Sequence, residues 1–166
     1  MKAELKKLDK KNLIALIADL YKKNNSVKEF LDFYVNPNQK EAHKKYREKI
    51  LEAFYPKRGD ALKLKDGKKA ISDFKKLDPS PELLIDLMLF FVENGVQYTN
   101  DFGDINEAFY ISMEKNYQKT LSLMEKEDLL KKFKDRAHRI VVESENTGWG
   151  FNETLWDIFG RYYPER

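Results

Sequence analysis

The chain has 166 residues and a net charge of +3, and charged residues make up 36% of it against 42% hydrophobic ones. This length and balance predict one soluble, helix-rich domain that is long enough to bury a sizeable core. The absence of cysteine excludes disulfides, iron–sulfur clusters and thiolate zinc sites. The first residues lack the apolar run of a signal peptide, so we expect a cytoplasmic protein without a membrane span.

Basic residues gather in the first half of the chain. Residues 1–83 hold 21 Lys and Arg against 13 Asp and Glu, whereas residues 84–166 hold 10 against 15. One interpretation is two solvated halves that attract each other within the fold, which is what a charge run usually means. The other is a basic surface for an acidic partner.

Four helices are predicted before residue 78. The first starts after Asp9, and the second starts where Ser26 and Glu29 match a capping box. A third is expected from about Gln39 to Tyr55, and a short fourth from Lys68 to Leu77. The apolar residues of the first two helices recur at helical spacing and are expected to face inward: Leu13, Leu16, Ile17, Leu20, Tyr21, Val27, Phe30, Leu31 and Tyr34.

The stretch Ser80–Gly95 is predicted to be the central core helix. Ser80 suits the N-cap, Pro81 suits the first helical position, and Gly95 can adopt the left-handed conformation that closes a helix. Between them apolar residues cover nearly the whole circumference, interrupted by Asp86, and such a helix is normally buried. At roughly 15 residues it is too short to span a bilayer.

The remaining residues predict a loop over 96–103 and then three helices. The long helix after the loop is expected to start at a capping-box-like pair, Asp104 and Glu107. The fold class is therefore all-α: about seven to eight helices in antiparallel pairs, forming an irregular bundle or a short right-handed superhelix. Residues 1–166 are expected to form a single domain, with a possible seam near 78–81 between its basic and acidic halves.

No pattern in the sequence indicates catalysis, a cofactor or a metal site. His43 and His138 lack a second histidine four residues away and are interpreted as surface or boundary residues. The oxygen-rich residues of segment 100–107 fail the spacing of an EF-hand, and capping explains the pair Asp104 and Glu107. We therefore expect a protein that is not an enzyme.

Binding of a protein or peptide partner, or of a second copy, through a groove between helix pairs is the function that the sequence favours. Trp149 lies between two glycines, where it forms either a plug against Trp156, Tyr162 and Tyr163 or an exposed anchor for a partner. Tyr98 and Phe102 are further candidates for partner contacts.

The alternative function is binding of nucleic acid or another polyanion through the lysine-rich residues 57–76. This stretch carries eight basic residues against three acidic ones, and phosphate binding depends on such clustering. It offers few arginines or free aromatic rings for reading bases. The candidate contacts are Lys57, Arg58, Lys63, Lys65, Lys68 and Lys69.

Several segments together resemble a known family. They are Asp32-Phe33-Tyr34 with Asn36-Pro37, residues 69–75, residues 79–84, Tyr98-Thr99-Asn100 with Gly103-Asp104, and residues 148–151. The chain resembles an uncharacterised bacterial family of similar length, catalogued as a domain of unknown function. The resemblance implies a small all-helical cytosolic protein and carries no activity, ligand or catalytic residue.

Overall fold

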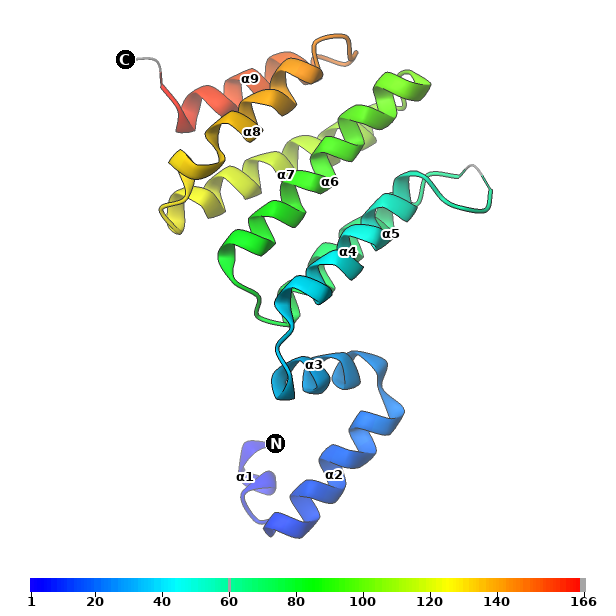
Figure 1. The fold of residues 1–166 in the computed structure, drawn as a ribbon, viewed down its shortest axis with the longest axis vertical. Helices are drawn as coiled ribbons and strands as arrows, with labels where there is room; N and C mark the ends of the chain where they lie inside the picture. Colours follow the sequence, from blue (N-terminus) through cyan, green and yellow to red (C-terminus); the bar gives the residue numbers. More distant parts are fainter. Residues whose placement is uncertain (60, 165–166) are drawn as a thin grey trace.

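The computed structural model describes residues 1–59 and 61–164, and every regular element in this range is a helix. The helices are α1 (Lys2–Leu5), α2 (Lys10–Lys23), α3 (Asn25–Val35), α4 (Gln39–Phe54), α5 (Leu64–Lys76), α6 (Pro81–Phe102), α7 (Glu107–Lys126), α8 (Leu130–Glu143) and α9 (Phe151–Tyr162). All but α1 are longer than two turns. The predicted all-α fold is confirmed, and α4 to α9 pack into a bundle (Figure 1).

Helix α6 is the centre of this bundle. Ile85, Leu87, Leu89, Phe91 and Val92 are completely buried, although they point in different directions around the helix. Helices α4 and α5 pack against one side of α6, and α7 and α8 pack against the other (Figure 1). The predicted core helix is therefore confirmed.

The end of α6 differs from the prediction. Gly95 does not close the helix, which continues to Phe102 and ends at Gly103 with φ of 85°. Gly95 instead allows α7 to approach, because a methyl group at this position would collide with the Met113 sulfur. The predicted loop over 96–103 is wrong for this reason, and Tyr98 and Phe102 lie on the last two turns of α6.

The N-terminal arm, residues 2–35, lies outside the core. Helices α1, α2 and α3 contain no buried residue. Of the residues expected to face inward, Leu13, Tyr21, Val27 and Leu31 are partly covered, whereas the expectation is wrong for Leu16, Ile17, Leu20, Phe30 and Tyr34, which are exposed. Figure 1 shows these helices extending away from the bundle beyond the start of α4. The capping box at Ser26 is also wrong, because Asn24 caps α3 by accepting from the backbone N–H groups of Ser26 and Val27.

Truncation of a side chain at the centre of α6 should be costly. Leu87→Ala or Phe91→Ala should lower the free energy of unfolding by about 2–5 kcal/mol, because each side chain is completely buried and its removal leaves a cavity in the core. Leu51→Ala on the exposed side of α4 is the control and should cost less than about 1 kcal/mol. Urea unfolding followed by circular dichroism measures both. A loss at Leu87 no larger than at Leu51 would mean that α6 is not the central element.

Candidate functional site

The candidate contact residues Tyr98 and Phe102 form an aromatic cluster with Tyr55 at the C-terminal ends of α4 and α6. The ring centroids of Tyr98 and Phe102 are 4.7 Å apart, and Tyr55 lies 5.8 Å from Tyr98 and 6.2 Å from Phe102. Phe102 is 66% exposed, whereas Tyr98 is partly buried. The cluster thus presents one accessible ring on a packed base.

Trp149 does not plug the core. Its side chain is 61% exposed, and its φ of 63° lies in the left-handed region, which a residue with a large side chain seldom adopts. Phe151 occupies the buried position next to it, with its ring 4.9 Å from that of Tyr110. Trp156 instead contacts the rings of His138 and Phe159, so the predicted plug is wrong.

Among the described residues, no ring of the aromatic cluster contacts Trp149. Two hydrogen bonds nevertheless connect the segment around the end of α6 with the segment that leads from α8 to Trp149. The Asn100 side chain donates to the Glu143 carbonyl at 3.0 Å, and Asp104 accepts from the Gly148 backbone N–H at 2.9 Å. Trp149, in the loop before α9, and Phe102, at the end of α6, are therefore exposed on neighbouring segments at one end of the bundle.

The oxygen-rich residues of segment 100–107 serve the structure. Asp104 accepts from Tyr110 as well as from Gly148, and these two bonds lower the pKa of its carboxyl group. Asn106, rather than Asp104, is the N-cap of α7 and accepts from the Phe109 N–H at 3.0 Å. Asp101 accepts from the Tyr55 hydroxyl at 2.8 Å. Across residues 1–59 and 61–164 no group of three or more His, Asp and Glu is arranged to hold a metal ion.

An ionic network around Asp86 joins three helices. Asp86 of α6 accepts from Arg47 of α4 at 2.8 Å and from Arg136 of α8, which also reaches Glu93 at 2.6 Å. His43 Nε2 lies 2.7 Å from an Asp86 oxygen, although the ring N–H is not aligned for a hydrogen bond. Of the two positions expected for His43, surface or boundary, the structure has the boundary one, since its side chain is only 14% exposed.

The network controls the charge of Asp86. Burial acts to raise the pKa of this carboxyl group, but His43, Arg136 and Arg47 outweigh it and hold the pKa well below its ordinary value. Asp86 therefore stays ionised in the folded protein and pairs with two arginines. The carboxylates of the network are occupied by these pairs, which makes the network a structural tie between helices.

The candidate polyanion contacts are spread over several surfaces. Lys57 and Arg58 lie in the loop between α4 and α5. Lys63, Lys65 and Lys68 line a cavity of about 570 Å³ between the start of α5 and the start of α7. Lys69 faces another cavity that also contains the carboxylates of Asp66, Asp73 and Glu52. The stretch therefore does not form a single surface.

Sequence reasoning missed the exposed apolar surface of the N-terminal arm. Seven of its large apolar side chains are between 39% and 80% exposed: Ile14, Leu16, Ile17, Leu20, Phe30, Tyr34 and Val35. No such series of neighbouring apolar residues is exposed elsewhere in the described helices. A surface of this kind marks an interaction site more often than an ordinary solvent face.

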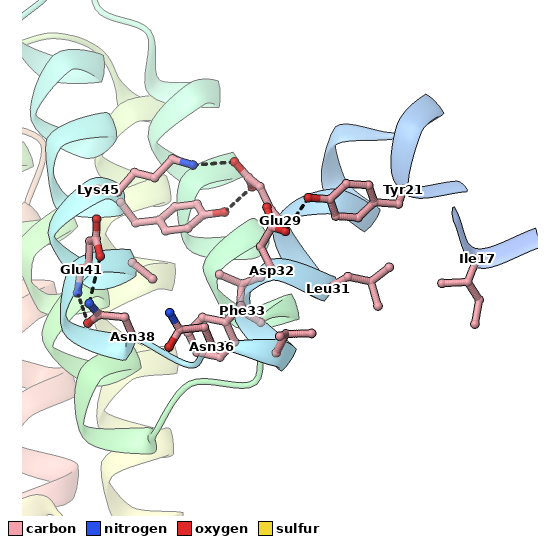
Figure 2. A pocket seen from close by; sticks show the side chains of 14 residues that line it. Ile17, Tyr21, Glu29, Leu31, Asp32, Phe33, Asn36, Asn38, Glu41 and Lys45 are labelled. Carbon is pink, nitrogen blue, oxygen red and sulfur yellow. Dashed lines mark hydrogen bonds and ion pairs between the residues drawn. The ribbon is translucent and has the colours of Figure 1, made fainter. Parts of the chain in front are cut away.

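The arm meets the bundle at a cavity of about 750 Å³ between α2, α3 and α4. Figure 2 shows Ile17 and Leu31 on the arm side of this cavity and Glu41 and Lys45 on the side of α4. Glu29 of α3 accepts from Lys45 at 2.7 Å, and this contact lowers the pKa of its carboxyl group. The arm is thus held at its base by polar contacts and by Phe33, which packs against the core, while the large apolar side chains farther along it stay exposed.

Tryptophan fluorescence tests the exposure of Trp149. The variant Trp156→Phe, in which Trp149 is the sole tryptophan, should emit near the wavelength of free tryptophan and be quenched readily by acrylamide, because most of the ring meets water. Trp149→Phe is the matched control and should give bluer, less quenched emission, since Trp156 contacts His138 and Phe159. Blue-shifted, protected emission from Trp149 would contradict the exposed position.

Loss of the Asp86 charge should destabilise the fold and change its response to acid. Asp86→Asn should lower the free energy of unfolding at neutral pH by about 1–3 kcal/mol, because two arginines lose their shared carboxylate at a partly exposed site. The lowered pKa of Asp86 means that its contribution is complete above the unfolded-chain value of about 4 and is lost as the pH falls further. The variant should therefore lose less stability on acidification than the natural protein.

Urea unfolding at neutral and acidic pH measures this difference. Asp157→Asn on the exposed face of α9 serves as the control and should behave like the natural protein. An Asp86 variant with unchanged stability at neutral pH would show that the network contributes nothing to the fold.

No helix in the described parts of the chain is long and apolar enough to cross a membrane.

Comparison with other proteins gives one result. Neither the curated proteins nor the solved structures include a significant match to this chain. A family model matches residues 1–162. The chain therefore belongs to the family described as a family of unknown function, DUF6155.

Proposed function

We propose that this protein is a non-enzymatic helical interaction module that binds a protein partner through its N-terminal arm. The observation that carries the proposal is the set of large apolar side chains of α2 and α3 that the described chain leaves exposed. We take the setting to be the bacterial cytoplasm, as the resemblance implies.

Helix α2 packs against α3, and the exposed apolar residues of α2 form a stripe along the helix. On α2 the residues Ile14, Ile17 and Leu20 follow at intervals of three and lie along one side of the helix. Lys10 extends the stripe at the start of α2, and the other charges of the helix lie off it, where Asp19 pairs with Lys23 at 2.8 Å. A partner therefore meets no unpaired charge at the centre of the surface.

The occupant that fits this surface best is the arm of a second copy. Two identical hairpins that face each other form a four-helix bundle, in which each apolar face covers the other. The pairing is self-complementary about a two-fold axis and closes without leaving a free surface. The aromatic side chains of Phe30 and Tyr34 would then become buried, as such anchors are in interfaces.

Replacing the centre of the stripe tests this proposal. Ile17→Glu combined with Leu20→Glu should convert a dimer to a monomer, because four like charges would enter the paired faces. Light scattering after size-exclusion chromatography measures the mass over a wide concentration range. The matched control is Asn12→Glu with Ala15→Glu, which adds the same charge to the opposite face of α2 and should leave the dimer intact.

Two results would contradict the proposal. The first is a natural protein that remains monomeric at all concentrations. The second is a dimer that persists in the Ile17 and Leu20 double variant. Circular dichroism of the variants should show an unchanged helix content, since these side chains make no core contact.

A second candidate function is binding of nucleic acid or another polyanion through the lysines of α5. The observation in its favour is that Lys65, Lys68, Lys69, Lys75 and Lys76 are all exposed on α5, while Ala70, Ile71 and Phe74 cover its inner face. Titration with mixed duplex DNA at low salt tests it, and absence of binding there would remove nucleic acid as a ligand.

A further inference from the structure

The lysines of α5 face lysines of α7 across a groove. Helices α5 and α7 both pack against α6, and a cavity of about 550 Å³ lies between them. One wall carries Lys68 and Lys75, and the other carries Lys119 and Lys126. No carboxylate lines this cavity. The two pairs come from parts of the sequence that lie more than 40 residues apart, so the fold creates this basic surface.

The groove continues toward the other end of α5. The cavity of about 570 Å³ between the starts of α5 and α7 shares Lys68 with the first one and adds Lys63 and Lys65. Asp66 is the one carboxylate in its lining. We call the two adjoining cavities the α5–α7 groove. It combines six lysines with a single acid along most of the length of α5.

The lysine charges are available to a ligand. Lys68, Lys75 and Lys119 form no ion pair with a carboxylate among the described residues, and all three are exposed. Lys126 lies 3.4 Å from its neighbour Glu127 at the end of α7. Like charges placed on both walls repel one another, so an acidic occupant relieves this repulsion as well as gaining its own pairs.

The floor of the groove is aliphatic. Between the lysines lie Ile71, Leu84, Met88 and Leu123, with no arginine or aromatic ring in this part of the lining. Bases of single-stranded nucleic acid stack on aromatic rings, and duplexes are read by arginine forks, so the lining does not suit either. An apolar floor between basic walls instead suits an occupant with an apolar stripe between acidic edges.

The spacing of the lysines specifies the form of the occupant. Lys68 and Lys75 are seven residues apart, as are Lys119 and Lys126, which corresponds to about 10.5 Å along each helix. Helices offer no free backbone edge to an extended peptide, so the occupant must satisfy its own backbone hydrogen bonds. A helix with apolar residues at heptad positions a and d and acids at e and g meets these requirements.

We infer that the α5–α7 groove binds an acidic amphipathic helix of a partner protein. The inference rests on the second candidate function, which is binding of an acidic ligand by α5. It differs in the ligand, which is an acidic helix of a protein rather than nucleic acid. It is independent of the N-terminal arm, which lies outside this groove. The partner helix lays its apolar stripe on Met88 and Leu123 and directs its carboxylates to Lys75 and Lys126.

The probe for this inference is a labelled peptide of three heptads with Leu at a and d and Glu at e and g. Fluorescence anisotropy at low salt should show binding, and added salt should weaken it. A peptide with Lys in place of Glu should bind at least tenfold more weakly. In the variant Lys75→Glu with Lys126→Glu this preference should reverse, so that the Lys peptide binds more tightly than the Glu peptide.

Two control variants separate the groove from net charge and from polyanion binding in general. Lys44→Glu with Lys131→Glu, on α4 and α8, changes the net charge by the same amount as the groove variant. It should leave the peptide affinity within about twofold of that of the natural protein, because neither residue lines the groove. Leu123→Ser should weaken the Glu peptide several-fold without affecting duplex DNA. Circular dichroism confirms that each variant is folded.

The possible results are distinct. The inference would be overturned if the Glu peptide bound the variant Lys75→Glu with Lys126→Glu as tightly as the control variant Lys44→Glu with Lys131→Glu. Binding of duplex DNA as tightly as of the Glu peptide, with the same loss in the Lys75 and Lys126 variant, would overturn it in favour of nucleic acid. Absence of binding to both peptide and DNA would remove the inference together with the second candidate function, and would leave the arm proposal unaffected.

Discussion

Burial of α6 is the constraint on which the rest of the structure depends. The helix is apolar on nearly all sides, and each exposed apolar side chain would lose about 1.5–3 kcal/mol of transfer free energy. Neighbours on every side are therefore needed, and α4, α5, α7 and α8 provide them. Gly95 contributes because it has no side chain, and a methyl group there would collide with Met113 of α7. The bundle is in this sense built around one helix.

Asp86 is the exception on α6 and determines how the outer helices are joined. A carboxylate on a half-buried helix face needs cationic partners, and Arg47 and Arg136 come from two different helices to supply them. The Arg47 guanidinium also lies 3.7 Å from the centre of the Phe90 ring, which adds a cation–π contact beside the ion pair. One polar residue in an apolar helix thus links α4, α6 and α8.

The two proposed binding surfaces differ in chemistry because they arise in different ways. The arm is apolar because α2 and α3 have hydrophobic stripes that the core does not bury, although Phe33 at the base of the arm packs against the core. The α5–α7 groove is basic because two helices that cover α6 turn their lysine faces toward each other. If the proposals hold, the first surface would select a partner mainly by apolar contact, whereas the second would select it by charge and spacing. Their separation would then allow one module to hold two partners.

The sequence by itself determined the position of most helices, though not all of their ends, and the identity of the core helix, because capping residues, proline breaks and apolar spacing act within a few residues of one another. It also located the apolar side chains of the arm, but an apolar stripe has the same pattern whether or not a partner covers it. The tertiary structure alone decided that the arm stays exposed and that Trp149 turns outward next to a buried Phe151.

The role of Gly95 and the existence of the basic groove could not be predicted from the sequence for the same reason. A glycine that closes a helix and a glycine that admits a neighbouring helix look alike in sequence, and only the position of Met113 distinguishes them. Lys119 and Lys126 lie in the acidic half of the chain, so composition separates them from Lys68 and Lys75. Packing on α6 brings the four together, because a surface charge depends on which residues share a face in space rather than in sequence.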